Sequence, residues 1–190
     1  AGALTQGGIL RVWEPSAAII LAAGGATRYG KPKQLLEIDN QPMVRRAACL
    51  ALAAGLHPVI VVVGAYSEEV KLALDGLPIM CVENPAWAQG QSTSLRAGLA
   101  QIPPECGGAI FLLTDQPFVS LDIILALVNA HSCSLAPIAA PRVGDQRANP
   151  VFFDRVTFPD LLSLEGDVGG RAVIQSGRYR VEWLDWLDAA

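Results

Sequence analysis

A short glycine-rich segment carries the residue types that bind phosphate groups. In Leu21 to Leu36, LAAGGATRYGKPKQLL, the pair Gly24-Gly25 follows an apolar run and precedes Arg28, Lys31 and Lys33. Glycines let the backbone approach a phosphate and aim its N–H groups at the oxygens. Arg can hold two phosphate oxygens at once, whereas Lys acts as a point charge. The segment therefore predicts a loop that binds the triphosphate of a nucleotide.

Two familiar phosphate-binding loops do not match this segment. A Walker A loop requires Ser or Thr after its Gly-Lys pair to hold magnesium, but Pro32 follows Gly30-Lys31 here. The dinucleotide fingerprint GxGxxG at the start of a helix is absent. The alternative is a merely flexible basic loop. The combination of the glycine pair with Arg28, Gly30, Pro32 and Lys33 favours phosphate binding over that alternative.

Two aspartates are candidates for holding a metal ion. Asp115, in Thr114-Asp115-Gln116-Pro117, follows the apolar run Ala109 to Leu113. A carboxylate at the carboxyl end of a strand is well placed to bind magnesium on a nucleotide. Asp167 lies between glycines in Gly166 to Arg171, in a flexible turn that would let it reach a metal held by Asp115. The alternatives are a turn-forming Asp before Pro and an acidic surface loop.

A third segment, Asn84 to Leu95, contains a glycine and polar residues at the start of an expected helix. Gly90 would permit close approach, and Gln91, Ser92 and nearby amides would face an anion or the edge of a base. The alternative is an ordinary helix start with Ser92 as its N-cap. On its own, this segment favours the ordinary helix start, but together with the glycine-rich loop it favours a role in binding the nucleotide.

Apolar runs and amphipathic stretches alternate along the first two thirds of the chain. Continuous apolar runs predict strands buried on both faces, as in a parallel sheet, at 17–21, 58–63, 79–82 and 109–113. Helices are expected at 43–54, 67–74, 93–101 and 121–130. We therefore predict a single Rossmann-like α/β domain with a doubly wound, mostly parallel sheet and helices on both faces.

The pattern changes after residue 130. Extended runs at 135–140 and 149–153 surround Gly144-Asp145, which is a turn signal, and predict a small antiparallel excursion. Residues 154–164 favour a helix that Pro159 interrupts. Residues 173–176 are expected to end a short helix, and residues 180–184 to form a last strand.

Composition excludes several classes of protein. The 190 residues carry a net charge of -4 and no cluster of basic residues outside the glycine-rich loop, so we expect no nucleic-acid partner. No apolar run approaches the ~20 residues of a membrane span. The four cysteines are widely spaced, which favours reduced thiols, mostly in the core of a cytoplasmic protein, over a zinc site. Residues 1–15 are expected to form an N-terminal lead, the first eight flexible or appended and without the basic start of a secretory signal.

The glycine-rich segment resembles the signature LAAGxxxRMGxPKxLL of nucleotidyltransferases with a Rossmann-like fold, with Tyr29 in place of the usual Met. Other segments resemble, in order, those of the MocA-type molybdenum-cofactor cytidylyltransferase family. They are Asn84–Leu95 (NxxWxxGxxxSL), Asp115–Pro117 (DQP), Arg147–Val151 (RGNPV or RGHPV) and Gly166–Arg171 (GDxGAR). Ala148 and Gly170 depart from the family's Gly and Ala. An alanine would be strained if position 148 needs a positive φ, and a simple hairpin entry remains an equal alternative there.

The resemblance spans roughly residues 17–176 and implies that residues 16–190 form a nucleotidyltransferase domain. It implies transfer of CMP from CTP, or of a nucleotide from another NTP, to molybdopterin, with a molybdenum hydroxylase apo-enzyme as a further partner. The LAAG start favours the cytidylyl branch, because the guanylyl branch usually starts LAGG.

The resemblance also implies residue roles, with Mg²⁺ as the cofactor. The catalytic residues would be Arg28, Lys33 and Asp115, and the metal ligands Asp115 and Asp167. The acceptor-binding residues would be Asn149, Pro150 and Arg171. The nucleotide-binding residues would be Leu21, Ala22, Ala23, Gly24, Gly25, Arg28, Lys33, Gly90, Ser92 and Ser94.

Two other functions stay open. A cytidylyltransferase of isoprenoid precursors or a sugar-phosphate nucleotidyltransferase would share the first loop and an acidic metal site, although the later motifs argue against both. A non-catalytic factor that delivers a nucleotide or cofactor to a molybdenum enzyme is compatible with the same residues.

Overall fold

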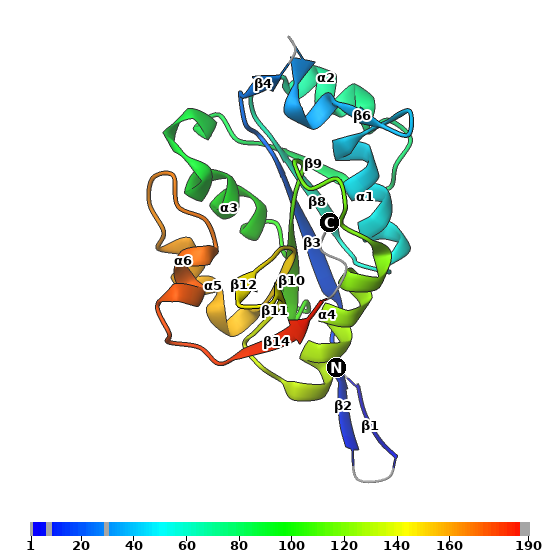
Figure 1. Ribbon diagram of the computed structural model, residues 1–190, viewed down its shortest axis with the longest axis vertical. Helices are drawn as coiled ribbons and strands as arrows, with labels where there is room; N and C mark the ends of the chain where they lie inside the picture. Colours follow the sequence, from blue (N-terminus) through cyan, green and yellow to red (C-terminus); the bar gives the residue numbers. More distant parts are fainter. Residues whose placement is uncertain (1, 7–8, 29–30, 187–190) are drawn as a thin grey trace.

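One mixed sheet forms the centre of the molecule (Figure 1). The computed structural model describes residues 2–6, 9–28 and 31–186, and of residues 2–6, 9–13, 27, 28 and 31 it describes the backbone alone. The strands of this sheet are β3 (Ser16–Ala22), β8 (Val59–Val63), β9 (Met80–Glu83), β10 (Gly108–Leu113), β11 (Ile138–Val143), β12 (Gln146–Arg147), β13 (Val151–Asp154) and β14 (Val181–Asp185).

The strand order is β12-β11-β13-β10-β3-β8-β9, and β14 pairs with β11. The pairs β10–β3, β3–β8, β8–β9 and β11–β14 are parallel. The pairs β10–β13, β11–β13 and β11–β12 are antiparallel and come from the C-terminal half of the chain. The predicted α/β fold, with a mostly parallel sheet and a small antiparallel excursion, is confirmed.

Helices cover both faces of the sheet, and each face has its own apolar cluster. The first cluster joins the sheet to α1 (Met43–Ala53), α2 (Ser67–Ala73) and α4 (Leu121–Ser134). The second joins it to α3 (Gln91–Leu99), α5 (Phe158–Leu162) and α6 (Arg171–Gln175). Within the described ranges, no helix has both the length and the apolar character needed to cross a membrane.

The central parallel strands β3, β8 and β10 are apolar over most of their length because both of their faces are covered. Strand β9, which was also predicted to be buried on both faces, lies instead at the edge of the sheet with Met80 and Glu83 exposed. In β3, Ile20 packs in the first cluster and Ile19 in the second, and both side chains are fully buried. All five residues of β8 are buried in the same way. Burying a side chain of this size contributes about 1.5–3 kcal/mol, which explains why these runs read so clearly as strands in the sequence.

The order β9-β8-β3-β10 reverses the direction in which the chain adds strands. The chain first adds β8 and then β9 on one side of β3. It then crosses back and adds β10 on the other side of β3. Ligands of open α/β sheets bind outside the carboxyl ends of the strands at such a reversal. The register pairs Leu21 with Leu113, so the loops that follow β3 and β10 begin side by side.

Several short elements connect these strands and helices. They are the hairpins β4 (Thr27–Arg28)–β5 (Lys31–Pro32) and β6 (Glu37–Ile38)–β7 (Gln41–Pro42), and the 3-10 turns η1 (Lys33–Leu35), η2 (Trp87–Gln89) and η3 (Arg155–Thr157).

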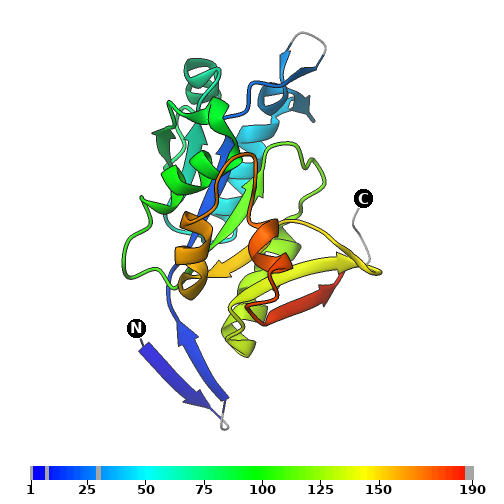
Figure 2. The same ribbon diagram turned by 90° about the vertical axis from the view of Figure 1, so that its left-hand side faces the viewer.

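Three segments differ from the sequence predictions. Pro159 does not interrupt a helix over 154–164; it lies in the first turn of α5, after η3, where its missing N–H needs no partner. Helix α4 continues past residue 130 to Ser134 and ends at Leu135, whose φ is 51°. The hairpin of β1 (Gly2–Gln6) and β2 (Ile9–Trp13), which the sequence did not predict, projects from one end of the molecule in Figure 1 and Figure 2.

The four cysteines are free, as predicted, but they are not mostly in the core. Cys106 is buried, Cys49 and Cys81 are half-buried, and Cys133 is exposed on α4. Burial raises the pKa of the Cys106 and Cys81 thiols above the usual range, so both favour the unreactive thiol form.

The contact between α3 and β3 generates a stability prediction. A Cβ added at Gly98 would lie 2.7 Å from Ile19 Cγ2 and 3.1 Å from Val62 Cγ2, and both neighbours are fully buried. Gly98→Ala should therefore lower the free energy of unfolding by up to about 2 kcal/mol, because overpacking costs about 1–3 kcal/mol and the gain in helix propensity offsets only about 1 kcal/mol of that cost.

Chemical denaturation measures this difference. In an Ile19→Ala background the same Gly98→Ala change should cost less, because the crowded neighbour is gone. A Gly98→Ala variant more stable than the wild type would contradict the close approach.

Candidate functional site

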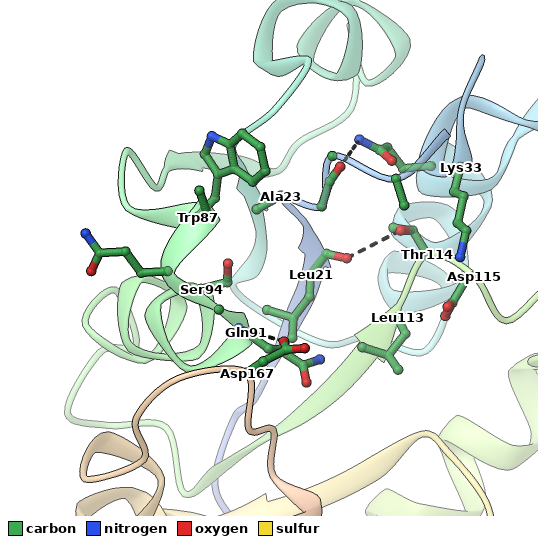
Figure 3. Close-up of a pocket in the computed structure, with 17 residues that line it drawn as sticks. Leu21, Ala23, Lys33, Trp87, Gln91, Ser94, Leu113, Thr114, Asp115 and Asp167 are labelled. Carbon is green, nitrogen blue, oxygen red and sulfur yellow. Dashed lines mark hydrogen bonds between the residues drawn. The ribbon is translucent and has the colours of Figure 1, made fainter. Parts of the chain in front are cut away.

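A cavity of about 730 Å³ opens at the carboxyl ends of β3 and β10 (Figure 3). We call it the glycine-loop cavity. Its volume is in the range of cavities that bind small molecules. Its walls are Leu21, Ala23, Gly24, Gly25, Ala26, Lys33, Gln34, Trp87, Ala88, Gln89, Gly90, Gln91, Ser94, Leu113, Thr114, Asp115 and Asp167.

Hydrogen bonds fold the glycine loop back over the end of β3. The buried Gln34 side chain donates through Nε2 to the Gly24 carbonyl oxygen at 3.1 Å. The Lys33 amide donates to the Ala26 carbonyl oxygen, also at 3.1 Å. These contacts fix the loop around its two glycines and bring Lys33 to the cavity wall.

Trp87 packs directly against two glycines, Gly25 of the cavity wall and Gly64 after β8. A Cβ added at Gly25 would lie 2.9 Å from Trp87 Cζ3, and one at Gly64 would lie 2.7 Å from Trp87 Cβ. The indole therefore occupies space that only glycine leaves free. Trp87 also contributes to the cavity wall, and the residue remains 37% exposed.

The opposite wall comes from the loop after β10. Thr114 Oγ1 donates to the Leu21 carbonyl oxygen at 3.4 Å, which ties the ends of β10 and β3 together. In Figure 3 the Lys33 amino group and the Asp115 carboxylate point toward each other on this side of the cavity. An ammonium group and a carboxylate therefore line the same cavity.

A buried asparagine organises the start of α3. Asn84, only 4% exposed, donates through Nδ2 to Thr93 Oγ1 at 2.8 Å and to Ser94 Oγ at 3.0 Å. Its Oδ1 accepts from the Ala86 amide at 3.0 Å. Asn84 therefore holds the segment between β9 and α3 and fixes Ser94 at the cavity wall.

The loop that carries Asp167 docks on the first turn of α3. The Gln91 amide donates to Asp167 Oδ1 at 3.3 Å, and the Ser92 amide donates to the Gly166 carbonyl oxygen at 3.2 Å. The N-cap of α3 is Gly90, so the alternative that Ser92 caps this helix is wrong. Helix N-terminal amides favour negative charge, and here a carboxylate from 76 residues away supplies it.

A second cavity, of about 290 Å³, adjoins the first. We call it the arginine cavity because Arg147 and Arg171 line it with Asn149. Arg147 donates to Asn149 Oδ1 at 3.2 Å. Burial, followed by the nearby positive charge of Arg171, lowers the pKa of Arg147 from its usual range. Among the described residues neither arginine has an ion-pair partner, so the pair is suited to an anionic ligand.

The two cavities bring together most of the predicted site residues. The glycine-loop cavity includes Leu21, Ala23, Gly24, Gly25, Lys33, Gly90, Ser94, Asp115 and Asp167, and the arginine cavity includes Asn149 and Arg171. Ala22, Ser92 and Pro150 line neither one; Ala22 packs in the first apolar cluster and Ser92 is fully buried. The Arg28 side chain lies outside the described part, and Arg28 pairs through its backbone with Lys31.

Position 148 accommodates alanine without strain. Among the described residues other than glycine, positive φ values occur at Asp39, Asn40, Tyr66 and Leu135. The Ala148 amide donates to the Pro141 carbonyl oxygen at 2.9 Å, as a hairpin residue does. The replacement of the family's usual glycine therefore leaves the local geometry intact.

Several residues at the cavities were not predicted as site residues, and four of them make the contacts described above: Gln34, Trp87, Thr114 and Arg147. Three of them lie inside or beside the segments that raised the site hypothesis, and Arg147 opens the segment that contains Asn149. The sequence analysis had therefore selected the segments in or beside which these residues lie. It could not show their contacts with Gly24, Gly25 and Leu21.

The carboxylates suit a divalent cation that arrives with a nucleotide. Asp115 and Asp167 both line the glycine-loop cavity, from different sides in Figure 3. No group of three or more His, Cys, Asp or Glu side chains that could hold a metal occurs among the described residues. Mg²⁺ is commonly held by one or two carboxylates together with substrate phosphates. The two carboxylates fit that arrangement. They do not fit a metal site in which protein side chains supply all the ligands.

Comparison with known proteins identifies the type of domain. The sequence model of the family described as MobA-like NTP transferase domain matches residues 18–182. Nicotine blue oxidoreductase of Paenarthrobacter nicotinovorans is 30% identical over 178 residues, covering 90% of this chain and 86% of that protein. Purine catabolism protein PucB of Bacillus subtilis (strain 168) is 28% identical over 172 residues, covering 84% and 80%.

A solved structure of similar sequence has the same fold. Rv0371c from Mycobacterium tuberculosis H37Rv superimposes with a TM-score of 0.81 at 28% identity, covering 91% of this chain and 88% of that one. Its complex with manganese gives a TM-score of 0.75 over 92% and 89% of the chains at the same identity. A relative of this chain therefore binds a divalent cation.

The docking of Asp167 on α3 generates a matched pair of predictions. Gly90 has φ 116°, and a Cβ there would collide with the Gly166 carbonyl group; Gly166 has φ 67°, and a Cβ there would meet nothing within 4 Å. Gly166→Ala should cost about 1 kcal/mol of unfolding free energy, from backbone strain alone. Gly90→Ala should cost about 1–3 kcal/mol more, because it also forces apart two packed loops.

Thermal and chemical denaturation of the two variants give the comparison. Equal destabilisation would show that the Asp167 loop does not approach Gly90 closely.

Proposed function

The chain belongs to the MobA-like NTP transferase family, and from this we propose that it transfers CMP from CTP to the phosphate of a molybdopterin-type acceptor and releases pyrophosphate. The junction of the two cavities is the observation that supports this proposal most. They share Leu21, Gln91, Leu113 and Asp167 as walls. A donor in one and an acceptor in the other would meet at that junction, as a transfer between two bound substrates requires.

The glycine loop would bind the triphosphate of the donor. We assign Lys33 and Arg28 to the phosphate oxygens, together with the backbone amides around Gly24 and Gly25. Glycines at these positions allow the phosphates to approach the backbone. Gly90, the N-cap of α3, and Ser94 in its first turn would face the nucleoside part of the donor, because both line the same cavity.

The arginine cavity would bind the acceptor phosphate. Arg147 is half-buried and Arg171 is exposed. Neither cation has a carboxylate partner in the described chain, and both line the cavity together with Asn149. Two guanidinium groups that repel each other gain most from a shared anion. A phosphate monoester satisfies both, which supports a phosphorylated acceptor for this site.

The chemistry is an in-line substitution at phosphorus. An oxygen of the acceptor phosphate attacks the α-phosphorus of the NTP, a new phosphoanhydride bond forms, and the bond to the β-phosphate oxygen breaks. Pyrophosphate leaves with the electron pair of that bond. The protein's contribution is to position the two phosphates and to neutralise the charge that develops on the leaving group.

Asp115 would hold a divalent cation. We propose that the Asp167 carboxylate gives up its hydrogen bond with the Gln91 amide of α3 and becomes a second ligand of the same cation. Such a cation neutralises phosphate charge. Asp115 would orient the nucleotide through that contact, and Lys33 would stabilise the pyrophosphate from the same side of the cavity. The bound manganese of Rv0371c supports the use of a divalent cation.

The choice of CTP and molybdopterin rests on motifs rather than on cavity shape. The LAAG start of the glycine loop supports CTP, and the ordered set of Asp115–Pro117, Arg147–Val151 and Gly166–Arg171 supports a molybdopterin-type acceptor over isoprenoid or sugar phosphates. We further propose that residues 16–190 are the transferase domain, that residues 1–15 are a lead outside it, and that a molybdenum hydroxylase apo-enzyme receives the product.

A redox reaction is a second candidate, favoured by the 30% identity to a protein named nicotine blue oxidoreductase over 90% of this chain. In that reaction a reduced nicotinamide nucleotide in the glycine-loop cavity would pass a hydride to an organic acceptor. Incubation with NADH or NADPH and nicotine blue tests it. Oxidation of the nicotinamide without any NTP-dependent pyrophosphate release would replace the transferase proposal.

Asp115→Asn tests the metal carboxylate. Pyrophosphate release from CTP in the presence of molybdopterin and Mg²⁺ should fall at least about a hundredfold, because a charge that stabilises the transferring phosphates is lost. The melting temperature should change little, since Asp115 is exposed. Asp75→Asn, an exposed aspartate away from the cavities, is the matched control.

Near-normal release by Asp115→Asn would remove this residue from the site. If the wild type releases no pyrophosphate with any NTP while still binding CTP and acceptor, the delivery factor becomes the better assignment.

Lys33→Ala tests the triphosphate contact. Its Kd for CTP should rise about tenfold or more, because a hydrogen bond to a charged group contributes about 1.5–3 kcal/mol. Lys71→Ala serves as the control, because Lys71 lies on α2 and pairs with Glu68 and Glu83 instead. Calorimetric titration with CTP measures both. An unchanged Kd in Lys33→Ala would argue against triphosphate binding by this loop.

A further inference from the structure

The loop between α5 and α6, residues 163–170, is attached to α3 by more than the two backbone amides that hold Gly166 and Asp167. In the last turn of α3, the Arg96 side chain donates through Nη1 to the Leu164 carbonyl oxygen at 2.7 Å. Among the described residues Arg96 forms no ion pair. Its guanidinium group therefore holds this loop rather than an acidic side chain.

The attachment points follow one side of α3 in the reverse order of the loop. Ser92 and Arg96 are separated by about one helical turn, so they lie on the same face of the helix. Arg96 holds Leu164, whereas Ser92 holds Gly166. The loop therefore runs antiparallel along α3 and brings Asp167 to the wall of the glycine-loop cavity, beside the start of the helix (Figure 3).

Packing does not hold the middle of this loop. Residues 165–168 are exposed, and the loop contains three glycines, which lose more conformational entropy on ordering than other residues do. Of the three hydrogen bonds to α3, the one from Arg96 is the shortest and has a charged donor, and the one to Asp167 is the longest. Arg96 is therefore the firmest attachment, and the Asp167 carboxylate is the one that a cation can most easily displace.

We propose that Arg96 is a positioning residue for Asp167: it keeps the loop docked on α3 while the Asp167 carboxylate exchanges the Gln91 amide for a nucleotide-bound cation. This inference rests on the proposed function, in which Asp167 becomes a second ligand of that cation. Without the contact to Leu164, the loop would have to be ordered each time the cation binds. Arg96 lines neither cavity, so it acts through the loop and not on the substrates.

Backbone amide exchange, measured by NMR, tests the docking of the loop without catalysis. The Gln91 and Ser92 amides lie in the first turn of α3, where the helix supplies no acceptor of its own. Their protection from exchange therefore reports the contacts with the loop. Both amides should be protected in the nucleotide-free wild type. With CTP and Mg²⁺, the Gln91 amide should lose its protection and the Ser92 amide should keep it.

Variants of Arg96 separate the hydrogen bond from the bulk of the side chain. In Arg96→Met, which removes the donor, both amides should exchange about tenfold faster or more without any ligand, because a hydrogen bond with a charged donor is lost. Arg96→Lys should restore the protection, since its ammonium group can donate to the same carbonyl oxygen. Arg45→Met is the matched control, because Arg45 donates to the Ala73 and Asp75 carbonyl oxygens at the end of α2, away from both cavities.

Calorimetric titration with CTP, with and without Mg²⁺, measures the consequence for the cation. The ratio of the two Kd values gives the contribution of the cation to nucleotide binding. This ratio should fall about tenfold in Arg96→Met and stay near the wild-type value in Arg96→Lys and Arg45→Met. The Kd for CTP without Mg²⁺ should be the same in all four proteins. A merely structural role would lower the melting temperature of Arg96→Met and leave the ratio unchanged.

The outcomes distinguish this inference from the transfer reaction. If no pyrophosphate is released but the exchange pattern and the change in the Kd ratio both hold, the positioning role stands and the transferase proposal falls. If transfer occurs and Arg96→Met has the wild-type Kd ratio, or keeps the wild-type protection of the Ser92 amide, the positioning role is overturned. A Gln91 amide that stays protected in the wild type with CTP and Mg²⁺ also overturns it.

Discussion

The parallel pairing of β3 with β10 puts two loops of different chemistry side by side, because Leu21 and Leu113 lie in register at the ends of these strands. The loop after β3 offers backbone amides and Lys33, and the loop after β10 offers Asp115. The hydrogen bond from the Thr114 hydroxyl to the Leu21 carbonyl oxygen ties the ends of the two strands together. Since the strand order reverses here, the sheet itself creates the crevice between the loops, and every other part of the proposed site is built around it.

The C-terminal half of the chain completes the site from the other side. Antiparallel strands bring Arg147 and Asn149 toward the crevice, and α6 brings Arg171. The Asp167 loop reaches across to the first turn of α3 through a close approach at Gly90. The glycine-loop cavity and the arginine cavity consequently share walls, which suits a reaction between two anionic substrates that have to meet.

The sequence predicted the sheet well, because strands buried on both faces are apolar throughout and β8 is buried along its whole length. It also predicted the segments that line the cavities, because glycines, aspartates and basic residues at strand ends carry a chemical reason for being there. It did not predict Gln34, Trp87 or Arg147. Their positions depend on contacts between distant segments, such as Trp87 against Gly25 and Gly64, and local patterns do not record such contacts. The small hairpins, and Pro159 in the first turn of α5, were missed for a related reason, since tertiary packing decides them.

The central claim is that the crevice between the ends of β3 and β10 is the nucleotide site. A crystal structure of the protein with CTP and Mg²⁺ tests it most directly. We expect the triphosphate on the Gly24-Gly25 amides and Lys33, with the cation bound by the Asp115 carboxylate. A nucleotide bound elsewhere on the sheet, or a cation that Asp115 does not contact, would contradict the account.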